Sequence, residues 1–342
     1  MIDLDTVKVQ PSLVIPKNAH QLVDQFGRYK NKLRISLTDR CNFRCSYCMP
    51  DEPQWLAKNE ILSFEEIIKL CRIMIPLGIS HIRLTGGEPL MRKNVIELVH
   101  ALNALRPLGL KRISMTSNAY YLEKYAKALK HAGLDDINIS LDSIRAETFL
   151  YMTQKRLEPV LKGIAAAIQE KLPLKLNCVL VAGQNDQEIL EITQWAYQRN
   201  IPLRFIEYMP LDQPEQWQPH KVIIEDYILQ RLTTEFHIEK QERSQEPATT
   251  YLLNGHYPLG VISTISKPFC HSCDRLRLTA QGELFTCLFS AVGTPLRNTL
   301  KDPLKTADII PIIQQAVWNK DAGFISHQTA PSRKISMHAI GG

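Results

Sequence analysis

The sequence lacks any apolar stretch long enough to span a bilayer, and it lacks the charged-plus-apolar start of a secretory signal peptide. We therefore expect no transmembrane helix and a cytoplasmic protein. Runs of lysine or arginine are also missing, and 41 basic against 35 acidic residues give a net charge of only +6. This balance argues against a nucleic-acid-binding arm. Any anionic ligand should instead be a small phosphate compound that is bound by local arginines.

Three of the eight cysteines stand close together at Cys41, Cys45 and Cys48, directly after the alternating run 33–37. This C-x3-C-x2-C spacing supplies three thiolates from one short loop. A [4Fe-4S] cluster held entirely by protein takes four cysteines, so three leave one iron open for a substrate or cofactor. With the aromatic Tyr47 before the last cysteine, the motif resembles that of the radical S-adenosylmethionine (SAM) enzymes, in which the open iron chelates the amino and carboxylate groups of SAM.

A zinc site or a disulfide is the alternative for this triplet. Structural zinc takes four ligands, usually with paired C-x2-C spacing, and no fourth ligand stands nearby. A reducing cytosol would keep the thiols free. Cys71 and Cys178 stand apart from the motifs, in a helical-looking and a strand-like run, and we interpret both as buried packing thiols.

From about Leu33 to Tyr208, short β-rich runs alternate with amphipathic stretches of helical length, which predicts a parallel sheet covered by helices. The expected strands are 33–37, 80–85, 111–116, 136–141, 174–181 and 202–208. The expected helices are 64–77, 93–105, 121–132, 157–171 and 186–199. The first helix should begin with a capping box of Ser63 and Glu66. No internal repeat or low-complexity tract interrupts this pattern.

Six such units are too few for a closed eight-stranded barrel, so the pattern predicts an incomplete (β/α)6 barrel like the radical SAM core, with its chemistry at the C-terminal strand ends. The segment 210–219 is rich in Pro, Asp and Gln and reads as a connection. The expected organisation is an N-terminal extension (1–25), the TIM-like α/β barrel (26–212) and a smaller α+β region (213–342).

Polar groups gather after several of these strands. Gly86-Gly87-Glu88-Pro89 follows the second; its glycines would let a ligand approach the backbone, and the Glu88 carboxylate can accept a bond from an ammonium group. Alone this is only a turn, but after such a cysteine triplet it resembles the element that binds the methionyl amine of SAM. Further polar residues at 116–118, 140–143 and 204–209 could be turn or cap chemistry singly. Their shared end of the sheet predicts one ligand pocket.

A second triplet, Cys270, Cys273 and Cys287, follows a C-x2-C-x13-C pattern and again supplies three ligands. The alternative is zinc with His271 as the fourth ligand. His271 lies inside the tight C-x2-C loop, which is an awkward place for a fourth ligand.

Arg275 and Arg277 alternate with Leu276 and Leu278 directly after this loop. On a strand, both guanidiniums would project to one face while the leucines enter the core. The guanidinium fork matches phosphate oxygens, which predicts a polyphosphate site. A solvated strand face is the alternative.

Together the motifs closely resemble the GTP 3′,8-cyclase family, which performs the first step of molybdenum cofactor biosynthesis. The resemblance extends from about Phe26 to the terminal Gly341-Gly342 and is carried by Thr38–Cys45, Gly86–Leu90, the second triplet with its Arg-x-Arg, and the Gly-Gly end. It implies two [4Fe-4S] clusters, one at each triplet, with the open iron of the second facing the guanine. The implied SAM residues are Tyr47, Gly87, Glu88, Ser140 and Met209. The implied GTP residues are Arg34, Arg83, Thr116, Lys175, Arg204, Arg275, Leu276 and Arg277.

The implied reaction begins when an external one-electron donor reduces the first cluster and SAM is cleaved to methionine and a 5′-deoxyadenosyl radical. This radical takes the ribose 3′ hydrogen of GTP, and attack on C8 leads to 3′,8-cyclo-7,8-dihydro-GTP. Orientation and exclusion of water are then the protein's part, and no side chain is assigned as a general acid or base. GTP and the electron donor are the expected partners, and the sequence leaves a homodimer open.

Two alternative functions remain, one enzymatic and one non-catalytic. A radical SAM peptide-modifying enzyme with an auxiliary cluster would resemble its relatives in carrying more cysteines than the three found after Met209. A non-catalytic iron–sulfur carrier or redox sensor would need neither a SAM pocket nor the arginine pair. Two departures from the family pattern stand out: Ala119 where Gly is usual, which matters if the turn requires a positive φ, and Asp274 in place of a common Asn.

Overall fold

The computed structural model describes residues 21–50, 52–211, 217–243, 246–301, 308–323 and 337–340. Most of residues 1–25, which the sequence predicts to be an N-terminal extension, and Gly341-Gly342 lie outside these ranges. The described strands are β1 (Lys32–Ser36), β2 (His81–Thr85), β3 (Arg112–Ser117), β4 (Asp136–Ser140), β5 (Leu174–Leu180), β6 (Leu203–Glu207), β7 (Ile238–Lys240), β8 (Thr249–Leu253), β9 (Tyr257–Ile262), β10 (Arg275–Leu278), β11 (Glu283–Phe285) and β12 (Thr294–Pro295). The described helices are α1 (Phe64–Met74), α2 (Val95–Asn103), α3 (Leu122–Ala132), α4 (Ala146–Thr153), α5 (Glu158–Gln169), α6 (Ile189–Gln198), α7 (Glu225–Leu232), α8 (Arg297–Lys301), α9 (Ile309–Trp318) and α10 (Met337–Ile340).

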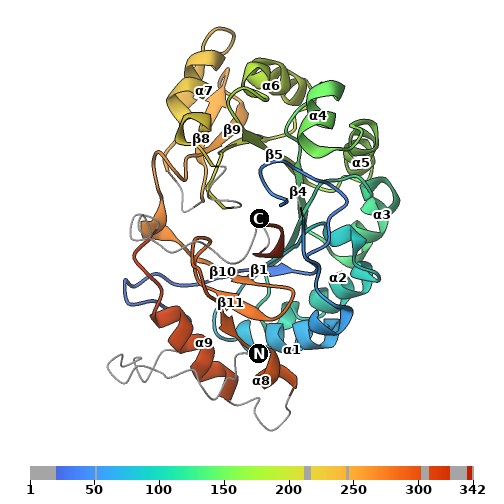
Figure 1. The fold of residues 1–342 in the computed structure, drawn as a ribbon, viewed down its shortest axis with the longest axis vertical. Coiled ribbons are helices and arrows are strands. Elements are labelled where there is room, and N and C mark those ends of the chain that lie inside the picture. Colours follow the sequence, from blue (N-terminus) through green and yellow to red (C-terminus); the bar gives the residue numbers. More distant parts are fainter. Residues whose placement is uncertain are drawn as a thin grey trace.

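All described strands belong to one sheet, in the order β12-β11-β10-β1-β2-β3-β4-β5-β6-β9-β8-β7. The run from β10 to β9 is parallel throughout, and antiparallel strands flank it at both edges. The sheet curves around a central space, and helices cover its outer face (Figure 1). Since the sheet ends at β12 and β7 rather than closing on itself, the expected incomplete barrel is confirmed.

The six expected strands and five expected helices are all present, with ends that differ by at most three residues. The layer between the sheet and the outer helices is apolar, and the side chains of Leu33 and Ile35 in β1 are fully buried there. The predicted capping box starts α1, where Ser63 Oγ accepts from the Glu66 amide at 3.2 Å and the Glu66 carboxylate accepts from the Ser63 amide at 2.7 Å. Such reciprocal bonds satisfy two backbone donors that a helix end leaves free.

The sequence pattern did not predict α4. Leu150 and Tyr151 of this short helix are exposed, so apolar residues do not mark a single face. Without that periodicity, the segment cannot be recognised as a surface helix.

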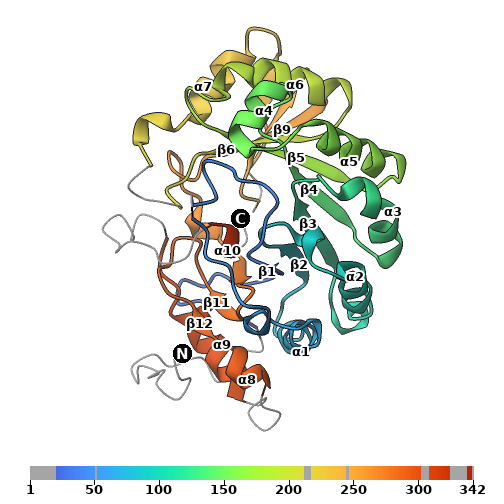
Figure 2. The same cartoon turned by 45° about the vertical axis from the view of Figure 1, so that its right-hand side comes forward.

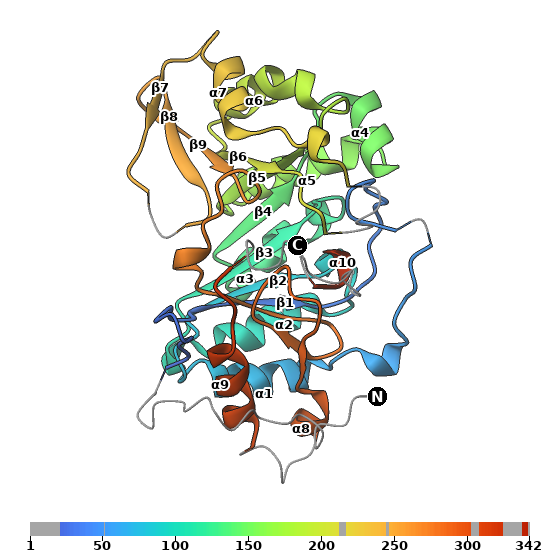
Figure 3. The same cartoon turned by 60° about the vertical axis from the view of Figure 1, so that its left-hand side comes forward.

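The C-terminal part of the chain contributes to both edges of the barrel sheet. β9 pairs with β6 and β10 pairs with β1, each in parallel. The sheet therefore continues across the boundary that the sequence suggests at residue 213, and the division into regions at that point stays a prediction. α8 lies beside α1 (Figures 1 and 3), and Lys69 Nζ of α1 donates to the Leu300 carbonyl of α8 at 2.7 Å.

The short helix α10 lies inside the ring of strands (Figures 1 and 2). Its His338 side chain is buried and contacts Trp55 edge to face, with the ring centres 5.8 Å apart. In the part of the chain that is described, no helix combines the length and apolarity needed to cross a membrane.

Candidate functional site

The sheet register sets three arginines side by side. Arg34 of β1 is paired with Arg277 of β10 on one side and with Arg83 of β2 on the other. Because paired residues of parallel strands project to the same face, three guanidiniums share one inner surface. Burial lowers the pKa of Arg34 well below its ordinary value, and the charges of Arg277 and Arg83 lower it further.

These arginines line a cavity of about 520 Å³ inside the barrel. Among the described residues of its wall, ten lysine and arginine side chains outnumber three carboxylates. Both cysteine triplets line the same cavity. The arrangement suits a polyanion, because guanidinium groups bind phosphate oxygens with two parallel hydrogen bonds.

The cavity brings together nearly all the residues that the sequence singles out. The SAM candidates in its wall are Tyr47, Gly87, Ser140 and Met209. The GTP candidates in its wall are Arg34, Arg83, Thr116, Lys175, Arg204, Arg275 and Arg277. Leu276 is the exception among the GTP candidates: its side chain is fully buried on the opposite face of β10 and does not line the cavity. Successive side chains of a strand point to opposite faces, which explains the position of Leu276. Arg275 and Arg277 both line the cavity, so they share a face as predicted.

Glu88 does not reach the cavity either, so the expectation that its carboxylate meets a ligand ammonium is not supported. The side chain is buried, and its oxygens accept from the Leu90 amide at 3.0 Å, the Ser117 hydroxyl at 2.8 Å and the Asn118 amide at 2.8 Å. Burial raises the pKa of Glu88 to about 7, against the opposing effect of these bonds. The residue ties the loop after β2 to the end of β3.

The two glycines before Glu88 are required by a close approach of the protein's own backbone. Gly86 has φ +146°, and a Cβ there would stand 2.6 Å from the Thr38 carbonyl oxygen. A Cβ on Gly87 would stand 2.2 Å from the Arg40 carbonyl oxygen. The Gly87 amide donates to Thr38 O at 2.7 Å and the Glu88 amide donates to Arg40 O at 2.9 Å. This element thus fixes the loop that leads into Cys41.

Around the first triplet, two donors form hydrogen bonds with the Cys41 sulfur, and one hydrogen bond attaches the loop to the end of β4. The Phe43 amide and the Asn118 side-chain amide donate to Cys41 Sγ at 3.4 and 3.8 Å. The Tyr47 hydroxyl donates to Asp142 Oδ2 at 2.6 Å, and Asp142 Oδ1 accepts from the Val179 amide at 2.9 Å. Burial raises the pKa of Cys41 to about 11, with the Glu88 charge adding to the effect.

The second triplet has a cationic environment. Burial alone would raise the pKa of Cys273, but Arg275, Lys320 and Lys30 outweigh it and lower the value to about 6. Arg275 Nη2 donates to Cys273 Sγ at 3.6 Å. Because the thiolate is the form that binds metal, this sulfur is prepared for a metal ligand role.

The cysteines fit iron–sulfur clusters in number and location. All eight cysteines lie in the described residues, and none of them forms a disulfide. The six of the triplets are half-buried in the cavity wall, whereas Cys71 and Cys178 are buried away from it, as expected of packing thiols. In the described residues, no three His, Cys, Asp or Glu side chains converge as they would on a single metal ion. A cubane takes one thiolate per iron, so its ligands need not converge on one point.

Several residues of the cavity wall lie outside the predicted set, among them Lys32, Arg112, Asp136, Glu246 and Lys320. Asp136 accepts from Arg112 Nε at 2.6 Å and faces Arg83 at 3.9 Å, so it holds two of the cationic side chains. The alternation of β3 and β4 could have placed Arg112 and Asp136 on the inner face. Nothing in the sequence pattern indicates that Lys320 lies beside the second triplet.

The family model described as the Radical SAM superfamily matches residues 35–196, and the one described as Molybdenum Cofactor Synthesis C matches residues 201–325. A crystal structure of Streptococcus suis SuiB bound to S-adenosylmethionine superimposes with a TM-score of 0.60 and 13% identity, covering 82% of this chain and 66% of that one. At this identity the likeness shows the fold alone.

Curated relatives extend the comparison over almost the whole chain. The GTP 3′,8-cyclase of Streptomyces coelicolor is 42% identical over 335 residues, which cover 95% of this chain and 98% of that protein. The Listeria monocytogenes GTP 3′,8-cyclase is 40% identical over 306 residues, 87% and 90% of the two chains. With a partial barrel, two cysteine triplets in one cationic cavity and this identity along its length, the chain belongs to the GTP 3′,8-cyclase family of radical SAM proteins.

Proposed function

We propose that this protein is a GTP 3′,8-cyclase: it cleaves SAM reductively and converts GTP to 3′,8-cyclo-7,8-dihydro-GTP, the first step of molybdenum cofactor biosynthesis. The observation that carries the proposal is a single cavity lined by both cysteine triplets and by the arginine row of β10, β1 and β2. SAM and GTP must react with each other, so their binding groups must share one enclosed space.

Cys41, Cys45 and Cys48 would hold one [4Fe-4S] cluster, and Cys270, Cys273 and Cys287 would hold the other. When bound, the clusters supply the electron that opens SAM at the first triplet and an open iron for the guanine at the second. The protein's own work is to orient both substrates and to exclude water. Two observations support these roles: the cavity wall encloses the site, and the hydrogen bond from Tyr47 to Asp142 fixes the loop of the first triplet.

The arginine row would receive the triphosphate. Three neighbouring guanidiniums repel one another in the free protein, and a polyanion replaces that repulsion with charge-assisted hydrogen bonds. Thr116, Lys175 and Arg204 extend the polar wall toward β6 and would complete the GTP site. Gly87, Ser140 and Met209 line the part of the wall that we assign to SAM, together with Tyr47.

The reaction also requires an external one-electron donor, and we expect it to take place in the cytoplasm, where reducing conditions keep cysteines free. The likeness to SuiB, which has also been crystallised with a precursor peptide, does not favour the peptide-modifying alternative, because 13% identity shows only the fold. The number of chains in the active protein stays open.

Anaerobic incubation with GTP, SAM and dithionite, followed by chromatography of the nucleosides, tests the proposal. Cys48→Ala should abolish SAM cleavage, since it removes a ligand of the first cluster. Cys287→Ala should still form some 5′-deoxyadenosine while losing the cyclised product. Normal cyclisation by the Cys287 variant would show that the second triplet is not a substrate site.

A further inference from the structure

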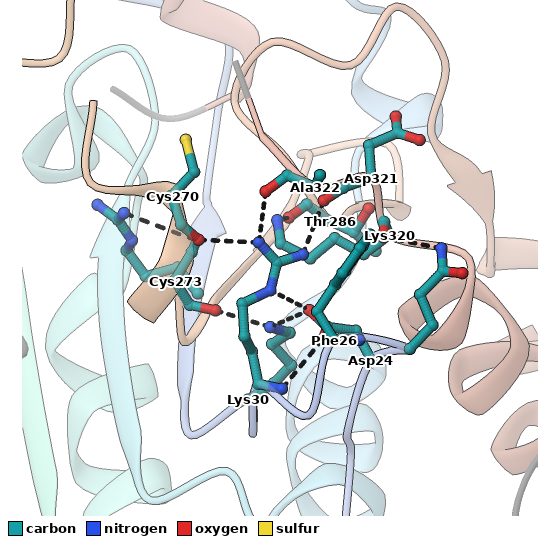
Figure 4. A network of polar contacts seen from close by, with 12 residues as sticks. Asp24, Phe26, Lys30, Cys270, Cys273, Thr286, Lys320, Asp321 and Ala322 are labelled. Atoms are coloured by element: carbon teal, nitrogen blue, oxygen red, sulfur yellow. Dashed lines mark hydrogen bonds and ion pairs between the residues drawn. The ribbon is translucent and has the colours of Figure 1, made fainter. Parts of the chain in front are cut away.

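The segment before β1 holds the loop of the second triplet through backbone carbonyls. The guanidinium of Arg28 donates to the carbonyl oxygens of Cys270 at 2.8 Å, Asp321 at 2.7 Å and Ala322 at 2.6 Å. One side chain thus joins three segments that are far apart in the sequence. Figure 4 shows Cys270, Asp321 and Ala322 gathered around these contacts.

Lys30 performs the same task at the next cysteine. Its Nζ donates to the Cys273 carbonyl at 2.6 Å and to Asp24 Oδ2 at 2.8 Å, as seen in Figure 4. Asp24 also accepts from Arg28 Nε at 2.6 Å. The side chains of Asp24 and Lys30 are completely buried. We call Asp24, Arg28 and Lys30 the N-terminal clamp.

The third cysteine of this triplet is reached through the same assembly. Lys320 Nζ donates to the carbonyl of Thr286, the residue before Cys287, and Lys320 precedes the two carbonyls that Arg28 holds. The backbone there lies so close to Cys270 that a Cβ on Gly323 would stand 2.7 Å from the Cys270 sulfur. All three cysteines are therefore positioned by one connected set of contacts.

The buried charges of the clamp are weak evidence for a purely stabilising role. Buried ion pairs are often matched or exceeded in stability by apolar side chains of similar volume, because both charges must be stripped of water. The two cations of the clamp exceed its one carboxylate, so the assembly carries net positive charge beside the second triplet. At the first triplet the described neighbours include the carboxylates of Glu88 and Asp142 instead.

We propose that Asp24, Arg28 and Lys30 are positioning residues for the second triplet, which hold the Cys270–Cys273 turn in its ligating arrangement and raise the reduction potential of the cluster bound there. This inference rests on the proposed function, in which a [4Fe-4S] cluster occupies that triplet. Addition of one electron makes a cluster more negative, and nearby positive charge and hydrogen bonds favour that form. No bond is made or broken in this step.

Two variants separate the holding role from the charge. Lys30→Met keeps the volume but removes the charge and the bond to the Cys273 carbonyl. Arg28→Lys keeps the charge, but three donors on one nitrogen cannot make the four contacts of Arg28 to Asp24 and the three carbonyls. Lys127→Met on the exposed face of α3 is the matched control. Because Lys30→Met leaves Asp24 with one partner fewer, the double variant Asp24→Asn, Lys30→Met removes the buried pair together and guards against failure to fold.

Reconstituted full-length proteins should be titrated with dithionite and followed by electron paramagnetic resonance, with added SAM identifying the first cluster. Lys30→Met should lower the reduction equilibrium constant of the second cluster about tenfold, which is about 59 mV for one electron, and should leave the first within about twofold. The double variant removes one positive and one negative charge and so keeps the net charge of the clamp, and its second potential should stay near wild type. Arg28→Lys should leave both potentials near wild type. An unchanged second potential in Lys30→Met, a shift of the double variant as large as that expected of Lys30→Met, or an equal shift of both clusters would overturn the charge role.

The holding role has a readout that does not depend on the second cluster. The Cys273 amide donates to the Cys270 carbonyl at 3.2 Å, and its hydrogen exchange reports on the turn. Arg28→Lys should speed this exchange at least tenfold while α3 exchanges as in wild type. Unchanged exchange would reject the holding role. Wild-type protein with only four irons would contradict the proposed second cluster, and the exchange result would still decide whether the clamp orders the turn.

Discussion

Arg34 is the centre of the arginine row, so its replacement should change the stability of the free protein and its affinity for GTP in opposite directions. Arg34→Gln removes a charge that stands between Arg277 and Arg83. At the strand spacing of about 4.8 Å and an effective dielectric constant of about 20, each neighbour would repel it by about 3 kcal/mol. Side chains fan apart and water screens them, so we expect the free protein to gain about 1–3 kcal/mol of stability, at the lower end of this range.

GTP binding should change in the opposite direction. A charge-assisted hydrogen bond contributes about 1.5–3 kcal/mol, so the affinity for GTP should fall by roughly tenfold to a hundredfold. Guanosine, which has no phosphate, should bind to wild type and variant almost equally. Calorimetric titration with both ligands, together with denaturant unfolding of the ligand-free protein, measures the two effects.

Leu276→Ala is the matched control because it lies on the same strand as Arg277 but faces the core. It should cost about 2–5 kcal/mol of stability and leave the preference for GTP over guanosine unchanged. If Arg34→Gln weakens GTP and guanosine equally, the row shapes the guanine pocket or the fold, and the triphosphate assignment must be withdrawn. A loss of stability in Arg34→Gln would refute the repulsion argument.

Three further predictions follow from the cysteines, a buried carboxylate and a strained turn. Anaerobically reconstituted protein should contain about eight irons, unchanged in Cys71→Ala and Cys178→Ala, and elemental analysis that finds four irons and one zinc would reject the two-cluster assignment. Burial would raise the pKa of Glu225, but hydrogen bonds from Ser263, Lys267 and Tyr251 outweigh this effect and lower the pKa. The stability that Glu225 contributes is therefore present above the ordinary Glu pKa of about 4.3 and is lost as the pH falls. Unfolding curves of wild type and Glu225→Gln should differ most near pH 7 and converge in acid, and a difference that grows in acid would contradict this sign. In Ala119→Gly, relief of a left-handed φ of +60° contributes about 1–2 kcal/mol and is opposed by about 0.5–1 kcal/mol of backbone entropy. Thermal unfolding should therefore show a net gain of stability between about 0 and 1.5 kcal/mol, and a clear loss would mean that packing of the buried methyl dominates.

The sequence predicts the barrel well because its strands are short, regular and separated by amphipathic helices. It also predicts which residues gather at the site, since spacing identifies the cysteines and alternation identifies the inner face of β10. Ala119 stands where the family pattern has Gly, and it does adopt a positive φ in the structure.

What the sequence does not reveal is the partner of each polar group. Glu88 has the chemistry to meet an ammonium group, but three donors of the protein occupy its oxygens. In the sequence, Arg28 and Lys30 resemble ordinary surface cations, and only the fold shows that they bind the carbonyls of Cys270 and Cys273. Local pattern cannot supply such contacts, because they join residues separated by most of the chain.

The pairing of β10 with β1 has a consequence for how the protein is made. β1 emerges from the ribosome well before β10, so the edge of β1 that faces away from β2 stays unpaired until β10 has been synthesised. Contacts between distant segments form slowly, and open strand edges invite aggregation in the meantime. A nascent or truncated chain would therefore carry Arg34 and the first triplet without the strand that completes the arginine row. A chain that lacks β10 cannot form the complete arginine row, so it should not sequester GTP.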